Sequence, residues 1–151
     1  MEFLRFIFFI VIAFLPSATS FFVQTGGWYS DLLKPAWTPP GWIFGPVWTV
    51  LYCTIGISGF FAWTRANARQ RRVPFTLFGL QLICNALWTV LFFHFHNPLL
   101  ALIDIYILLI LIIALMFVFY PLSKIASFLL LPYALWVLFA SILNLNIHVM
   151  N

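Results

Sequence analysis

The chain has 151 residues, of which 65% are hydrophobic, 21% are aromatic and only 7% are charged, and its formal net charge is +4. So few polar side chains cannot cover a water-soluble globule of this size, which excludes a soluble enzyme and indicates an integral membrane protein. A membrane-spanning helix needs about 20 apolar residues, because a helix rises about 1.5 Å per residue across about 30 Å of hydrocarbon.

Five apolar runs meet this length, at roughly 3–23, 42–64, 74–95, 99–120 and 124–147. The runs are continuously apolar and do not alternate as barrel strands do, and five such strands would not close a barrel. They occupy most of the chain and leave no room for a soluble domain. The sequence therefore predicts an all-α integral membrane fold, a single domain over 1–151 that forms a bundle of five transmembrane helices.

The first run resembles a secretory signal, because Arg5 precedes the apolar stretch and the small residues 17–20 follow it. Two features argue against removal of this run. Apolar residues continue through Val23, and a five-helix bundle would lose one wall. We therefore expect a retained first span.

The connection between the first two runs, here called the lid, is rich in aromatic residues and proline. Four of the seven tryptophans lie between residues 28 and 52, in this connection and the start of the second run, together with Pro35, Pro39, Pro40 and Pro46. Tryptophan and tyrosine rings settle at the bilayer interface or stack on flat ligands, and proline fixes the backbone that presents them. This composition predicts an aromatic and proline-rich binding lid at one membrane surface.

Small residues and proline predict local helix geometry in two of the runs. Gly41 and Gly45 form a small-xxx-small pattern, and Gly56 and Gly59 thin another part of the second run, which favours close helix packing. Pro132 lies inside the fifth run and should kink it.

Two runs carry polar and aromatic residues at helical spacing on one face, which should point inward in a bilayer. These residues are Gln81, Asn85, Trp88 and Phe92 in the third run, and Tyr133, Trp136, Ala140 and Asn144 in the fifth, with Trp48 and Tyr52 from the second. They would line an apolar pocket with a few directional hydrogen-bonding groups. Alternatively, the amides hold helices together and the aromatic rings pack where small residues let helices approach. The residues alone leave both interpretations open.

The ionisable residues inside the runs form no catalytic or metal-binding set. Asp104 is the only carboxylate well inside a run, which favours a hydrogen bond between helices over a proton relay. His94 and His96 fall on different helix faces, and Cys53 and Cys84 lack metal-ligand spacing. We therefore expect no metal centre and no required cofactor.

Basic residues concentrate in the second connection, which carries Arg65, Arg69, Arg71 and Arg72. The fourth connection carries Lys124, whereas the charges of the first connection cancel. The positive-inside rule then places the N-terminus and connections two and four on the cytoplasmic side, with the lid and the C-terminus opposite. Contacts with lipid headgroups account for the basic cluster, so nucleic acid is not expected as a partner.

Longer motifs run through nearly the whole chain in order. They read Trp28-Tyr29-x-x-Leu32-x-Lys34-Pro35-x-Trp37-x-Pro39-Pro40, Gly45-Pro46-Val47-Trp48-x-x-Leu51-Tyr52, Gln81-x-x-x-Asn85-x-x-Trp88-x-x-x-Phe92-Phe93, Ala101-Leu102-x-Asp104 and Leu131-Pro132-Tyr133-x-x-Trp136-x-x-Phe139-Ala140-x-x-Leu143-Asn144. In these motifs the chain resembles the TspO/MBR family of translocator proteins and tryptophan-rich sensory proteins, once called peripheral-type benzodiazepine receptors.

The resemblance implies a five-helix bundle, often a homodimer, with a pocket under the first loop. That pocket would accept porphyrins such as protoporphyrin IX or haem, and drug-like isoquinolines or benzodiazepines. Carried onto this chain, its ligand-binding residues would be Tyr29, Trp37, Pro40, Trp48, Asn85, Trp88, Trp136 and Ala140. The animal cholesterol motif needs an aromatic and a basic residue that the stretch 143–151 lacks, which argues against cholesterol as a partner.

Three functional hypotheses follow. The first is a membrane receptor or sensor that binds porphyrin and drug-like ligands, with a role in tetrapyrrole transport or regulation. The second is a light-dependent porphyrin-degrading enzyme, because some members of the family are reported to use two pocket tryptophans that match Trp48 and Trp136 here. The third is a transporter or scaffold without chemistry, and the lack of an internal repeat weighs against coupled transport.

Overall fold

The computed structural model describes residues 1–21, 23 and 27–151, and over these residues all regular structure is helical. The elements are α1 (Glu2–Phe14) with the 3₁₀ turn η1 (Leu15–Phe21), α2 (Gly27–Asp31), α3 (Gly41–Arg65), α4 (Arg72–Thr89) with the π turn η2 (Val90–His94), α5 (Pro98–Phe119), α6 (Lys124–Leu129) and α7 (Leu131–Met150). Within the described residues, five helical stretches are long and apolar enough to span a membrane. The predicted all-α class and the five predicted spans are confirmed, with ends that differ by only a few residues.

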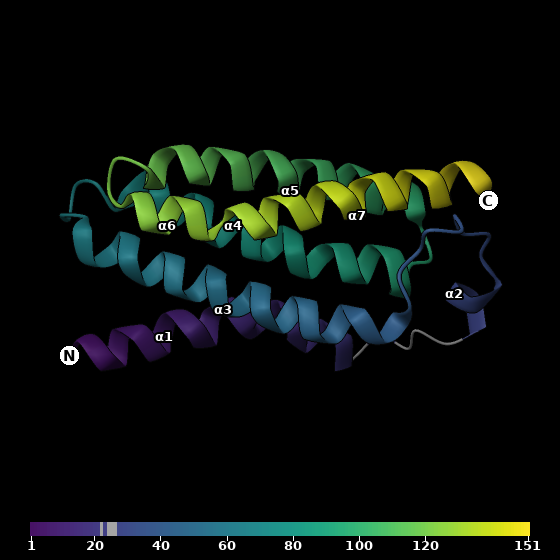
Figure 1. The fold of residues 1–151 in the computed structure, drawn as a ribbon, viewed down its shortest axis with the longest axis horizontal. Coiled ribbons are helices and arrows are strands. Elements are labelled where there is room, and N and C mark those ends of the chain that lie inside the picture. Colours follow the sequence, from purple (N-terminus) through teal and green to yellow (C-terminus); the bar gives the residue numbers. More distant parts are fainter. Residues whose placement is uncertain (22, 24–26) are drawn as a thin grey trace.

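Figure 1 shows α1 beside α3 at one side of the bundle and α5 with α7 at the other. The N-terminus and the connections α3–α4 and α5–α6 lie at one end, whereas α2 and the C-terminus lie at the opposite end (Figure 1). The lid and the basic second connection are thus separated by the length of the bundle, as the sequence predicts. Which end faces the cytoplasm stays a prediction.

Two glycines of α3 let α1 approach closely. A Cβ built on Gly56 would lie 2.8 Å from Cδ1 of Ile10, and one on Gly59 would lie 2.8 Å from Cδ1 of Phe9. The close helix packing that the small residues predict therefore occurs at Gly56 and Gly59, between α3 and α1 of the same chain. A Cβ on Gly41 or Gly45 meets no described atom within 4 Å.

Proline and capping residues set the helix boundaries. The fifth span is interrupted at Leu130, two residues before Pro132, and the Leu130 amide donates to the Ser127 carbonyl at 3.1 Å. Pro132 has no N–H to continue the helical ladder, so the predicted kink is a break between α6 and α7. Asn97 caps α5, because its Oδ1 accepts from the Leu100 amide at 3.0 Å.

Candidate ligand-binding site

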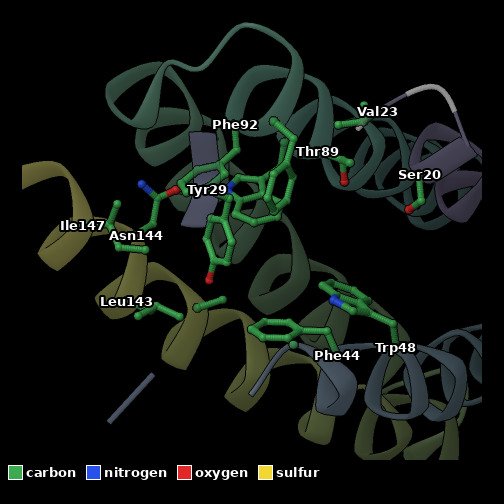
Figure 2. A pocket seen from close by; sticks show the side chains of 14 residues that line it. Ser20, Val23, Tyr29, Phe44, Trp48, Thr89, Phe92, Leu143, Asn144 and Ile147 are labelled. Carbon is green, nitrogen blue, oxygen red and sulfur yellow. The ribbon is translucent and has the colours of Figure 1, made fainter. Parts of the chain in front are cut away.

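A cavity of about 320 Å³ lies at the lid end of the bundle. Its described lining comes from η1, the lid, α3, α4 with its π turn, and α7: Ser20, Val23, Tyr29, Gly41, Phe44, Trp48, Trp88, Thr89, Phe92, Phe93, Ala140, Leu143, Asn144 and Ile147. Figure 2 shows the Tyr29 side chain reaching into the space between Phe92 on one side and Phe44 with Trp48 on the other. The lid therefore contributes a side chain to the interior of the site.

Lys34 holds the short helix α2 in shape. Its Nζ donates to the carbonyls of Tyr29 at 2.6 Å and Leu32 at 2.8 Å, and lies 4.8 Å from the centre of the Tyr29 ring. A cation at the C-terminal end of a helix satisfies carbonyls that have no helical partner. Lys34 thus fixes the backbone that carries Tyr29, and its ammonium group is engaged within the lid.

The lid rests on the π turn at the end of α4. The Tyr29 ring contacts Phe93 with centroids 5.5 Å apart, and the Trp28 ring contacts Phe92 at the same separation. The π turn is closed by the Phe95 amide, which donates to the Val90 carbonyl at 3.0 Å. Turns of this kind often occur at functional sites, and here both neighbouring phenylalanines line the cavity.

A second attachment joins the lid to the end of α7. The Asn151 side chain accepts from the Leu33 amide and donates to the Leu33 carbonyl, both at 3.0 Å. The same amide group also donates to the Ile147 carbonyl at 2.8 Å. The lid is therefore closed by paired hydrogen bonds as well as by aromatic contacts.

The wall below Trp48 is a hydrogen-bonded network of three helices. Trp48 stacks on Tyr52 with ring centroids 5.3 Å apart. The Tyr52 hydroxyl donates to Asn85 Oδ1 at 3.0 Å, Asn85 Nδ2 donates to the Tyr133 hydroxyl at 2.9 Å, and that hydroxyl donates to Gln81 Oε1 at 2.9 Å. Asn85 and Gln81 therefore act as the helix-joining amides of the alternative interpretation.

The opposite wall is fixed by a second amide. The Trp88 indole N–H donates to Asn144 Oδ1 at 3.0 Å, and Asn144 Nδ2 donates to the Pro98 carbonyl at 2.9 Å. Trp88 also stacks on Phe92 with centroids 5.2 Å apart. Asn144 borders the cavity and joins α4, α5 and α7. At this residue the amide therefore both lines the pocket and holds helices together.

The structure brings four of the eight predicted ligand-binding residues to the cavity wall: Tyr29, Trp48, Trp88 and Ala140. Asn85 lies behind the wall in the network below Trp48, and Pro40 precedes α3, where its carbonyl accepts from the Ile43 amide at 3.0 Å. Trp136 and Trp37 do not line the cavity in this conformation.

Trp136 lies one layer behind the cavity. Its ring contacts Phe44, a lining residue, at 5.8 Å and Phe139 at 5.4 Å, and Phe139 in turn contacts Trp37 at 5.7 Å. These four rings form a continuous series of aromatic contacts from Trp37 in the lid to Phe44 in the cavity wall. The expectation that Trp48 and Trp136 both line the pocket thus holds for Trp48, whereas Trp136 contacts the lining residue Phe44 from behind.

Several lining residues were not assigned from the sequence although a signal was present. Phe44 lies one helical turn before Trp48, and Leu143 and Ile147 follow Ala140 at helical spacing. Phe93 carried no such signal, because its position depends on a π turn that the sequence pattern does not reveal.

The described lining residues carry no formal charge, and their polar side chains are Ser20, Tyr29, Thr89 and Asn144 besides the indoles. Burial raises the pKa of the Tyr29 hydroxyl, so this group stays protonated at neutral pH and remains a hydrogen-bond donor. Such a site suits an uncharged, flat, mostly apolar group, and its described wall offers no general acid and base pair.

Comparison with known proteins identifies the protein family of this chain. The TspO/MBR family profile matches residues 6–150. The chain belongs to the TspO/MBR family. It is 49% identical to the tryptophan-rich protein TspO of Archaeoglobus fulgidus over 138 residues, which cover 89% of this chain and 88% of the relative.

More distant members of the TspO/MBR family show the same correspondence. The human translocator protein is 34% identical over 119 residues, which cover 78% of this chain and 70% of that protein. The tryptophan-rich sensory protein of Cereibacter sphaeroides is 29% identical over 151 residues, which cover all of this chain and 94% of the relative. Family membership and the five spans establish an integral, multi-pass membrane protein.

Proposed function

We propose that this TspO/MBR protein is a membrane receptor or sensor that binds flat, mostly apolar ligands in the cavity beneath the lid. The ligands are porphyrins such as protoporphyrin IX or haem, and isoquinoline or benzodiazepine-like compounds. The observation that carries the proposal is an uncharged cavity with Trp48 and Trp88 in its wall and Tyr29 reaching in from the lid. The names of its relatives, translocator protein and sensory protein, support a receptor or sensor role.

Aromatic walls supply both affinity and orientation for flat rings. An offset-stacked or edge-on aromatic pair contributes about 0.5–1.5 kcal/mol beyond the burial of apolar area. The Tyr29 hydroxyl and the Asn144 side chain add directional polar groups at the lid end of the cavity. Stacking therefore provides most of the affinity, and these polar groups select the orientation.

The volume of the cavity distinguishes ligands that fit beneath the lid from ligands that need the lid to move. Its volume of about 320 Å³ lies at the lower end of the range of about 300–1,000 Å³ in which drug-sized ligands bind. An isoquinoline-type ligand suits the closed cavity, whereas a tetrapyrrole needs the lid to move outward. The attachments of the lid are a few hydrogen bonds and ring contacts, which such a movement can break.

The test is a titration of tryptophan fluorescence with protoporphyrin IX in darkness, using the full chain in detergent or in lipid nanodiscs. We expect saturable quenching that an isoquinoline carboxamide displaces. Quenching that rises linearly with porphyrin and resists the competitor would reject a defined site and favour the scaffold alternative.

The second candidate function is light-dependent degradation of bound porphyrin. It is favoured by the position of Trp48, which lines the cavity and stacks on Tyr52 with planes 29° apart. An indole beside an excited pigment can donate an electron, with dioxygen as the final oxidant. Repeating the titration under light distinguishes the two functions, because only an enzyme gives new product absorbance.

A further inference from the structure

A second cavity, of about 430 Å³ and more open to the surface than the first, lies on the other side of the lid helix α2. It is bordered by α2, by the segment before α5 and by the end of α7, and it holds the imidazoles of His96 and His148. Nothing in the proposed function so far uses this cavity.

The two cavities are back to back. Neighbouring residues of α2 face different cavities, Tyr29 the first and Trp28 the second, and on α7 Ile147 borders the first and His148 the second. Between them the Trp28 ring contacts Phe92, a lining residue of the first cavity, with centroids 5.5 Å apart. The partition is therefore one layer of aromatic side chains.

His96 is held against this partition. Its ring stacks on Trp28 with centroids 4.4 Å apart and planes 19° apart. Its φ of 51° lies in the left-handed region, which is uncommon for a residue other than glycine. His96 thus adopts a backbone conformation of higher energy at the point where its imidazole stacks on Trp28.

The chemistry of the two cavities is complementary. The described lining of the first carries no charge, so it offers nothing to balance a carboxylate, and Lys34 is engaged with carbonyls of the lid. The second cavity supplies two imidazoles, each of which donates a hydrogen bond when neutral and carries a positive charge when protonated. A ligand with a flat apolar body and a carboxylate arm matches this arrangement.

We propose that the second cavity is a carboxylate subsite: when the lid has moved far enough to admit a porphyrin ring to the first cavity, one propionate passes Trp28 and is bound by His96 and His148. This inference rests on the proposed porphyrin binding and names which part of the ligand each cavity recognises. The subsite gives carboxylic porphyrins an advantage over uncharged ligands of the same shape.

The experiment compares protoporphyrin IX with its dimethyl ester, which keeps the ring and removes both negative charges. The variants are His96→Asn, which tolerates the left-handed backbone, His148→Gln, and the double variant. We expect the acid to bind the double variant about tenfold more weakly than wild type, whereas the ester binds both equally. His94→Gln is the matched control, because His94 borders neither cavity.

Two further arms keep the outcomes distinct. His148→Lys places an ammonium group at this position and should retain acid binding. An isoquinoline carboxamide should bind every variant alike if the fold is intact. Equal losses for acid and ester in the double variant would assign the histidines to the fold and overturn the subsite, as would an unchanged preference for the acid. If wild type binds neither porphyrin nor the isoquinoline, the proposed function itself fails.

Discussion

The Asn85 side-chain amide donates to the Tyr133 hydroxyl at 2.9 Å while its Oδ1 accepts from the Tyr52 hydroxyl at 3.0 Å. One side chain thus joins α3, α4 and α7 directly beneath Trp48, which stacks on Tyr52. The amide is 5% exposed and does not border the cavity, so it acts on ligand binding through the wall that it supports.

We therefore predict that Asn85→Ala destabilises the bundle by about 1–3 kcal/mol, because two buried hydroxyls lose a partner in a medium without water. The measurement is thermal denaturation in detergent. Asn146→Ala is the control, since among the described residues its amide bonds the Ile142 carbonyl of its own helix and no other helix. A variant with unchanged stability and abolished binding would instead make Asn85 a direct ligand contact.

Ala140 gives a second prediction, because it is the small residue among the α7 side chains that line the cavity. Ala140→Phe places a ring in the ligand volume, so affinity for an isoquinoline carboxamide should fall at least tenfold with little change in melting temperature. Leu138→Phe, on the exposed face of α7, is the matched substitution and should leave affinity unchanged. Equal affinity for both variants would move the site away from this cavity.

Lys34 tests the lid. Lys34→Met keeps much of the side-chain length and removes the donor that holds the carbonyls of Tyr29 and Leu32. We expect ligand dissociation to become several-fold faster, since the lid opens more readily, with a smaller change in association. Stopped-flow displacement measures both rates, and Arg69→Met, in the connection at the opposite end of the bundle, is the control. An unchanged dissociation rate would show that the lid does not limit release.

The sequence predicts the bundle well and the site only in part, for a physical reason. Spans follow from apolar length, and the inward faces of Gln81, Asn85 and Phe92 follow from the helical period, so the structure confirms both. Side-chain packing decides which aromatic residues line the cavity and which lie in the layer behind the lining residues. Trp136 has the same spacing from Ala140 as a lining residue, yet Phe44 from α3 stands in front of it.

Local irregularities are a second reason. The π turn at Val90–His94 brings Phe92 and Phe93 to the cavity together, and Lys34 folds back on α2 to fix Tyr29. Neither feature has a periodic signal in the sequence. The second cavity has no periodic signal either, because His96 and His148 lie far apart in the chain and border one cavity only in the folded bundle.

The last prediction concerns light-dependent chemistry, for which the structure ranks the two candidate tryptophans. Trp48 lines the cavity, whereas Trp136 is separated from it by Phe44. Electron donation to an excited porphyrin weakens with distance, so Trp48→Phe should slow light-driven loss of porphyrin absorbance more than Trp136→Phe does. Dark binding should persist in both variants, since phenylalanine keeps much of the ring area. The rate per bound ligand, measured from the porphyrin absorbance band under constant illumination, checks the order.

Asp104→Asn is the control and should leave that rate unchanged, because this carboxylate is buried outside the cavity wall. If Asp104→Asn abolishes the light reaction while Trp48→Phe retains it, the indole mechanism is wrong and a proton relay replaces it.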